Sequence, residues 1–519
     1  MTEIEIYDTT LRDGSQGEGV NLSLADKLQL ARVLDWLGVA WIEGGWPLSN
    51  DKDRAFFREA RALSLSTARL AAFGSTRHFR NRPEEDPNLQ ALVAAEADAC
   101  CIFGKTWDLH VRDALRVSLD DNLEMIASSV AYLRRATGRP VFYDAEHFFD
   151  GFRANPEYAL ATLAAAWQAG AERLVLCDTN GGSLPEQVTA AVQAVRARFP
   201  EAWLGIHVHN DGGLAVANTL AAVAAGCRQV QGTINGIGER CGNVDLCPVI
   251  ANLELKLGRR CLPEGRLSRL TEASRAVWER VNFVAPPNQP FVGRAAFAHK
   301  GGVHVSAVQR NTATYEHVPP ESVGNERRIL ISELAGRSNI QAKLAARFPA
   351  LTDQALLKAI LDEVVEKEHR GWSFEAAEGS FELLVRRRLG SWKPAFKLHH
   401  YRVHGLGTDS ADHLVEATVK LEVNGQCKLC VAEGHGPVDA LNGALRAALH
   451  PSYPELADLH LTDYKVRVVD SKEGTAARVR VLIEHSFRGR SFGTVGVSEN
   501  IIEASWDALV EGIECALQC

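Results

Sequence analysis

The sequence has 519 residues, more than one hydrophobic core usually organises, so we expect several domains. Apolar residues make up 46% and charged residues 24%, and the net charge of −8 argues against nucleic acid or an anionic membrane as a partner. The sequence shows no secretory signal and no apolar run of membrane-spanning length, and its eleven scattered cysteines favour a reducing compartment. A cytoplasmic location is therefore expected.

Short apolar runs alternate with longer helical patterns over the first half of the chain. The runs predict eight strands, at Ile4–Thr9, Trp41–Gly45, Leu70–Gly74, Ala99–Phe103, Val141–Glu146, Leu174–Thr179, Gly205–His209 and Gln229–Ile234. Helical patterns between them include Leu24–Leu37, Asn122–Ala136, Pro156–Ala169 and Leu214–Ala225. Several are followed by a helix-terminating glycine, at Gly38, Gly138, Gly170 and Gly226. Residues 1–258 are thus predicted to form a (β/α)8 TIM-barrel catalytic domain.

The rest of the chain changes character twice. Residues 259–394 are mostly helical and more charged, which predicts helical linker subdomains. Residues 395–519 are predicted to form an α+β domain in which a strand-strand-strand-helix unit occurs twice. Its strands are expected at His413–Val423, Gly425–Glu433, Tyr464–Asp470, Thr475–His485 and Arg490–Val495, and its helices at Pro437–Leu449 and Glu499–Ala516.

Polar residues cluster where the predicted barrel strands end. Because the C-terminal face of a TIM barrel carries its chemistry, these clusters are expected to converge on one site. They are Asp8–Gln16, Glu43–Asn50, Asp144–His147, Asp178–Gly182, His207–Asp211 and Asn235–Asn243.

His207 and His209 lie two residues apart on the seventh predicted strand, so both imidazoles point into the barrel near its mouth. Such a pair needs partners, and the alternatives are a metal ion or ordinary interior hydrogen bonds. Asp13, after the first strand, completes an oxygen and nitrogen site for a divalent cation such as Mg²⁺, Mn²⁺ or Zn²⁺. Asn243, after the eighth strand, is either a further oxygen ligand or a turn residue.

Other polar residues at the same mouth suggest substrate binding and catalysis. Arg12 offers a cation that stabilises charge on a substrate oxygen, or forms a salt bridge with Glu43, or does both. Asp144 and Glu146 lie two apart on the fifth strand, where neighbouring carboxylates shift each other's pKa. The Thr179 hydroxyl ends the sixth strand and is a candidate to hold a substrate carboxylate.

Taken together, these residues resemble the DRE-TIM metallolyase superfamily. Asp8–Gln16 looks like its first-strand motif, and Glu43 matches the glutamate of its Arg/Asp/Glu set. His207–Asp211 and Asn235–Asn243 match its seventh- and eighth-strand motifs.

Within the superfamily the chain looks like the Claisen-condensing branch, which includes 2-isopropylmalate, homocitrate and citramalate synthases. The resemblance covers nearly the full length, including a C-terminal domain similar to their regulatory dimerisation domain. The segments most similar to the citramalate-forming subgroup are Glu43–Pro47, Phe103–Trp107, Asp144–Gly151 and Gly493–Trp506. Trp46 and Trp107 are therefore expected in the acceptor pocket, whereas Leu48 departs from the glycine usual in that subgroup.

The resemblance implies a metal-dependent condensation of acetyl-CoA with a small 2-oxo acid, with pyruvate favoured, on the isoleucine branch of branched-chain amino-acid biosynthesis. Arg12, Thr179 and Asp144 would bind substrate. His304 and Tyr315, or Glu146, would assist proton removal from acetyl-CoA. A homodimer and isoleucine as an effector of the C-terminal domain are also implied.

Three other interpretations stay open at this point. The first is a 2-isopropylmalate or homocitrate synthase that uses another 2-oxo acid. The second is a retro-aldol acyl-CoA lyase of the same superfamily. The third is an amino-acid sensor with an inactive barrel. The C-terminal duplication argues against the lyase. The intact set of Arg12, Asp13, His207 and His209 argues against the sensor.

Overall fold

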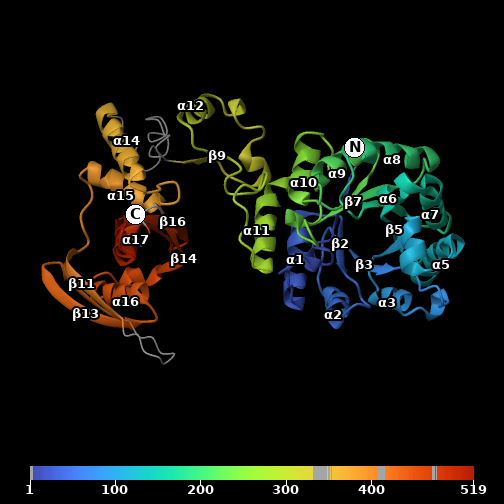
Figure 1. Ribbon diagram of the computed structural model, residues 1–519, viewed down its shortest axis with the longest axis horizontal. Coiled ribbons are helices and arrows are strands. Elements are labelled where there is room, and N and C mark those ends of the chain that lie inside the picture. The colour runs from blue at the N-terminus through green and yellow to red at the C-terminus, as the bar shows by residue number, and fades with distance from the viewer. Residues whose placement is uncertain are drawn as a thin grey trace. The chain divides into compact units, whose positions relative to one another are not determined.

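The computed structural model describes residues 4–330, 348, 351, 353–405, 415–469, 474 and 476–518. Eight parallel strands in chain order form a closed barrel, so the predicted TIM barrel is confirmed. Figure 1 shows these strands, coloured blue to green, inside a ring of helices. The strands are β1 (Glu5–Asp8), β2 (Trp41–Gly45), β3 (Arg69–Ser75), β4 (Ala99–Lys105), β5 (Val141–Glu146), β6 (Arg173–Asp178), β7 (Leu204–Val208) and β8 (Gln229–Gly232).

Capping side chains and glycines set the ends of several helices around the barrel. In the first, the Ser23 side chain and Asp26 cap each other's backbone N–H groups, which satisfies two donors at the helix start. The four predicted terminating glycines all adopt left-handed backbone conformations, with φ between 64° and 119°. The helices are α1 (Leu24–Leu37), α2 (Asp51–Ala60), α3 (Pro87–Ala95), α4 (Asp108–His110), α5 (Leu119–Thr137), α6 (Phe148–Ala154), α7 (Pro156–Gln168), α8 (Pro185–Arg198), α9 (Ala215–Ala224), α10 (Leu246–Leu255) and α11 (Leu270–Val281).

The chain divides into two compact units. The first comprises Met1–Phe297 with His317–Arg327, and the second comprises Ala298–Glu316 with Arg328–Cys519. The second unit begins with the short paired strands β9 (Ala298–His299) and β10 (Arg328–Ile329), and with helices α12 (Gly302–Arg310), α14 (Gln354–His369) and α15 (Glu378–Arg388). The domain limits predicted at residues 258 and 394 rest on changes in sequence composition, whereas the two units rest on compactness, and those limits remain predictions.

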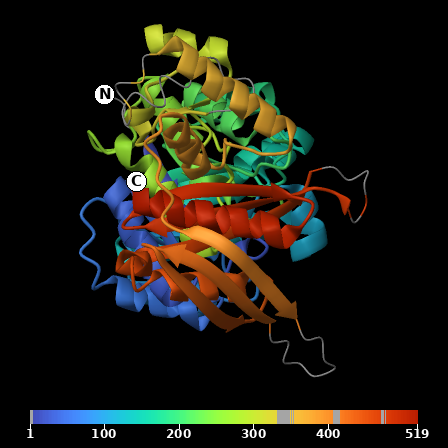
Figure 2. The same cartoon turned by 90° about the vertical axis from the view of Figure 1, so that its left-hand side faces the viewer.

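The C-terminal part of the second compact unit contains two three-stranded antiparallel sheets, and each sheet is followed in the chain by a helix. The first contains β11 (Lys397–Gly405), β12 (Val415–Val423), β13 (Gln426–Gly434) and α16 (Pro437–Leu449). The second contains β14 (Leu459–Val468), β15 (Val479–Phe487), β16 (Arg490–Ser498) and α17 (Ile501–Gln518). Each helix packs on its own sheet, and Figure 2 shows α17 in red along its strands.

The sequence patterns did not identify β11, and parts of three predicted strands, at 413–414, 470 and 475, lie outside the described residues. Among the helices that the structure describes, none combines the length and apolar character needed to cross a membrane.

Candidate active site

Asp13, His207 and His209 converge at the C-terminal end of the barrel, and we call these three residues the ligand cluster. One ligand atom from each lies within 4.8 Å of the others. Nε2 of His207 is 3.3 Å, and Nε2 of His209 is 3.9 Å, from Oδ2 of Asp13. All three are buried. Burial opposes the charge on Asp13, but Arg12 and the two histidines outweigh it and hold its pKa below the usual range.

The chemistry of the ligand cluster fits a divalent cation. Nδ1 of His207 lies 3.0 Å from Oε1 of Gln231, which only accepts, so Nδ1 carries a proton and Nε2 is the ring nitrogen that faces Asp13. Burial and then His207 lower the pKa of His209 to about 4, so that ring is neutral near pH 7. Oδ1 of Asn243 is buried without a hydrogen-bond partner in the described part of the chain. The backbone of Asn243 pairs with that of His209, so this amide oxygen belongs to the surroundings of the ligand cluster and is a candidate acceptor for a cation.

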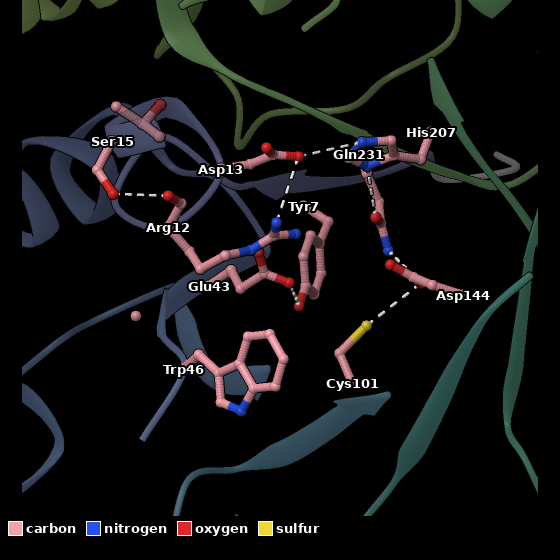
Figure 3. A network of polar contacts seen from close by, with 12 residues as sticks. Tyr7, Arg12, Asp13, Ser15, Glu43, Trp46, Cys101, Asp144, His207 and Gln231 are labelled. Atoms are coloured by element: carbon pink, nitrogen blue, oxygen red, sulfur yellow. Dashed lines mark hydrogen bonds and ion pairs between the residues drawn. The ribbon is translucent and has the colours of Figure 1, made fainter. Parts of the chain in front are cut away.

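Arg12 is held beside the ligand cluster by two carboxylates, as Figure 3 shows. Its Nε donates to Oε2 of Glu43 at 2.5 Å, and its Nη1 lies 3.4 Å from Oδ2 of Asp13. The guanidinium also lies 3.6 Å above the Phe73 ring. The Tyr7 hydroxyl donates to the other oxygen of Glu43 at 2.8 Å. Both sequence interpretations of Arg12 are therefore compatible, because the pinned guanidinium still faces the mouth.

Asp144 lies beneath the ligand cluster and is linked to it through one amide (Figure 3). Its Oδ1 accepts from Nε2 of Gln231 at 3.1 Å and from Sγ of Cys101 at 3.2 Å. Gln231 in turn contacts His207, so the three side chains form one buried row. Burial, opposed in part by His207, raises the pKa of Asp144 to about 6. The carboxylate therefore supports a ligand as well as lining the cavity.

Glu146 and Thr179 lie at the rim of the same mouth. Glu146, at the end of β5, forms an ion pair with Lys105, at the end of β4. Oγ1 of Thr179 accepts the backbone N–H of His147 at 2.8 Å. Because the hydroxyl oxygen is occupied as an acceptor, its own proton remains available to donate to a carboxylate.

Two adjoining cavities open at this end of the barrel. The smaller, which we call the acceptor cavity, has a volume of about 230 Å³ and is lined by Arg12, Asp13, Gln16, Trp46, Phe73, Phe103, Asp144, Glu146, Cys177, Thr179, His207, His209, Glu239 and Arg240. The larger, which we call the second cavity, measures about 530 Å³ and shares Trp46 and Phe103 with it. Nε1 of Trp46 donates to Asn88 at 2.8 Å, and Leu48 lines the second cavity.

Three predicted site residues are not assigned to the acceptor cavity by the structure. Trp107 does not line the acceptor cavity; it stacks on His110, with ring centroids 5.3 Å apart. His304 and Tyr315 belong to the second compact unit, where their rings stack at 4.1 Å. Their predicted roles remain predictions.

The sequence assigned no role to several residues at the site, among them Gln231 and Lys105, although Lys105 falls within the segment Phe103–Trp107. Gln231 pairs in register with His207, and Lys105 pairs in register with Glu146. The sequence feature that could have identified Gln231 is a polar residue near the C-terminal end of a predicted strand. Lys105 lies beyond the predicted limit of its strand, so this feature does not identify it.

Comparison with known families divides the chain into three matches. Residues 3–277 match the HMGL-like family, residues 291–370 match the homocitrate synthase post-HMGL domain-like family, and residues 375–517 match the LeuA allosteric (dimerisation) domain. The first match contains the ligand cluster.

Curated relatives match over nearly their whole length. The (R)-citramalate synthase of Synechocystis sp. is 54% identical, over 100% of this chain and 96% of its own. The (R)-citramalate synthase of Aquifex aeolicus is 51% identical, over 98% of this chain and 97% of its own. That of Geobacter sulfurreducens is 50% identical, over 100% and 98%.

Proposed function

This chain belongs to the (R)-citramalate synthase family, and from that premise we propose that it condenses acetyl-CoA with pyruvate to give (R)-citramalate and free CoA. It is an acyltransferase that converts the acyl group into an alkyl group on transfer. The observation that best supports this chemistry is the ligand cluster, which lies beside Arg12 in a cavity large enough for a small 2-oxo acid.

Asp13, His207 and His209, with Asn243 as a further oxygen, would hold a divalent cation. Bound there, the cation would supply Lewis-acid chemistry to the 2-oxo acid. Oxygen and nitrogen ligands of this kind suit Mg²⁺, Mn²⁺ and Zn²⁺ alike.

The chain's own residues orient the acceptor and stabilise the charge that develops on it. Arg12, fixed by Glu43, stabilises the negative charge that forms on the keto oxygen when the carbonyl carbon is attacked. Thr179 donates a hydrogen bond from its hydroxyl group to the pyruvate carboxylate. A base, either Glu146 or a relay of His304 and Tyr315, removes a proton from the acetyl-CoA methyl group. Hydrolysis of the resulting thioester releases CoA.

The test is a free-thiol assay with acetyl-CoA and four acceptors: pyruvate, 2-oxobutyrate, 2-oxoisovalerate and 2-oxoglutarate. Because the acceptor cavity is small and bounded by Trp46, Phe73 and Phe103, pyruvate should give the highest kcat/KM. The product should co-elute with (R)-citramalate on a chiral column.

Preference for 2-oxoisovalerate or 2-oxoglutarate would overturn pyruvate as acceptor and leave the metal chemistry standing. The lyase alternative predicts no thiol release from these mixtures and cleavage of a hydroxyacyl-CoA instead. The sensor alternative predicts isoleucine binding without turnover of any mixture.

Three further features belong to the proposal. The match to the LeuA allosteric (dimerisation) domain supports a homodimer, and sedimentation of the full chain tests it. Isoleucine is the proposed effector of that domain, and a cytoplasmic location remains the expectation from the sequence.

A further inference from the structure

Lys105 lies on the wall between the two cavities. It ends β4 directly opposite Glu146 on β5, and the two side chains form an ion pair. Lys105 lines the second cavity, whereas Glu146 lines the acceptor cavity. Their side chains are 20% and 23% exposed, so the pair is neither sealed in the core nor screened by bulk solvent. An ammonium group therefore lies where the contents of the two cavities would meet.

The proposed condensation creates negative charge on two oxygens, and only one of them is accounted for so far. The keto oxygen of the acceptor is served by the ligand cluster and Arg12. The thioester oxygen of acetyl-CoA also becomes negative, because the methyl group reacts as an enolate. Reacting carbons must approach to about 3–3.5 Å, and the second cavity adjoins the acceptor cavity, so an acetyl group bound in the second cavity can reach the acceptor. Lys105 lines that second cavity.

The other cations around the two cavities are committed to partners. Arg12, bound by Glu43 and Asp13, is already assigned to the keto oxygen of the acceptor. Arg240 donates to both oxygens of Asp211, at 2.8 and 2.9 Å. Arg77 donates to the Ser128 hydroxyl at 2.8 Å and to three backbone carbonyls. The Lys105 ammonium has three N–H donors, and its ion pair with Glu146 needs one of them.

We propose that Lys105 is a catalytic residue that stabilises the enolate of acetyl-CoA, an inference that rests on the proposed function. Of the two bases named above, Glu146 is the one that acts in this step: a methyl C–H bond breaks and its proton passes to the carboxylate of Glu146. The C–H electrons form the new C=C bond, and the carbonyl π electrons move onto the thioester oxygen. Negative charge thus moves from Glu146 to that oxygen. The Lys105 ammonium, paired with the first, donates a hydrogen bond to the second, so little reorganisation is needed.

The test compares Lys105→Met, which keeps the length of the side chain, with Lys105→Arg, which keeps the charge. Losing one such donor costs about 10²-fold in kcat or more, so Lys105→Met should lose that much while KM for pyruvate stays within about twofold. Lys105→Arg should recover to within about tenfold of the unsubstituted protein. Lys358→Met, on the exposed surface of α14, is the matched control and should leave both constants unchanged.

The isotope effect separates direct action from packing. With methyl-deuterated acetyl-CoA, Lys105→Met should show a larger primary effect on kcat/KM than the unsubstituted protein, because proton removal has become slower than the other steps. If Lys105→Met does not fold, as judged by circular dichroism, Lys105→Gln takes its place with the same expectation.

A kcat within threefold of the unsubstituted protein, or an unchanged isotope effect in a folded variant, would overturn the role of Lys105 while the proposed function stands. If the unsubstituted protein releases no thiol with any acceptor, the proposed function fails, and the role of Lys105 fails with it.

Discussion

Each end of the barrel carries a carboxylate among polar side chains, but the two ends differ in the hydrogen-bond donors that the chain supplies. At the N-terminal end, Glu5 accepts from Arg173 through both oxygens, at 3.1 and 3.2 Å, and from Gln229 at 3.3 Å. At the C-terminal end, Asp13 faces two imidazoles, and Oδ1 of Asn243 has no partner in the described residues. At the N-terminal end of the strands, the chain's own donors satisfy the carboxylate of Glu5. At the C-terminal end, several side chains that can act as acceptors lie close together.

This difference shows why burial of charge alone does not identify a site. A carboxylate whose oxygens are all taken by the chain's own donors can only hold the strands together. Lone pairs directed at one point repel each other unless a cation or protons lie between them. The C-terminal end is therefore built for a ligand, whereas the N-terminal end is already complete.

The largest expected effect comes from removing one member of the ligand cluster. Asp13→Asn and His207→Ala should each lower kcat by at least about 10³-fold, because the Lewis acid and its template are lost together. Circular dichroism and the thermal midpoint should stay close to those of the unsubstituted protein. More than a tenth of the original turnover in either folded variant would contradict the assignment.

A smaller effect, on stability and not on chemistry, is expected at the N-terminal end. Arg173→Met leaves Glu5 without its two charged hydrogen bonds, so the barrel should lose about 2 kcal/mol of unfolding free energy, measured by urea denaturation. The kcat of the folded variant should stay within about twofold.

Arg69→Met is the matched control at this end, because Arg69 is 52% exposed and lies 3.7 Å from Glu5. It should cost less than about 1 kcal/mol. Equal losses from both substitutions, or a large loss of kcat in Arg173→Met, would remove the distinction between the two ends.

The barrel was predictable because its strands and helices have different hydrophobic periods. β2 and β5 begin and end at the predicted residues, and the other barrel strands differ by one or two residues at an end. The sequence pattern does not predict β11, because most of its positions are exposed and its residues include lysine, arginine and three histidines. A strand without a clear alternation of buried positions offers little periodic signal.

Within the site, single ligands were predictable but their supporting partners were not. His207 and Asp13 follow from position on a strand and from ligand chemistry. Gln231 and Lys105 depend on which residue lies opposite in the neighbouring strand, and that register emerges only when the barrel closes. Trp107 lies beyond the end of β4, where the chain turns it toward His110.

The central claim is that Asp13, His207 and His209 bind one divalent cation. The direct measurement is titration of the metal-stripped protein with Mn²⁺, with free Mn²⁺ followed by electron paramagnetic resonance. The account predicts one tight site per chain in the unsubstituted protein, and loss of that site in Asp13→Asn and in His207→Ala but not in Arg173→Met. Tight binding of one Mn²⁺ by both cluster variants, with the affinity of the unsubstituted protein, would contradict it.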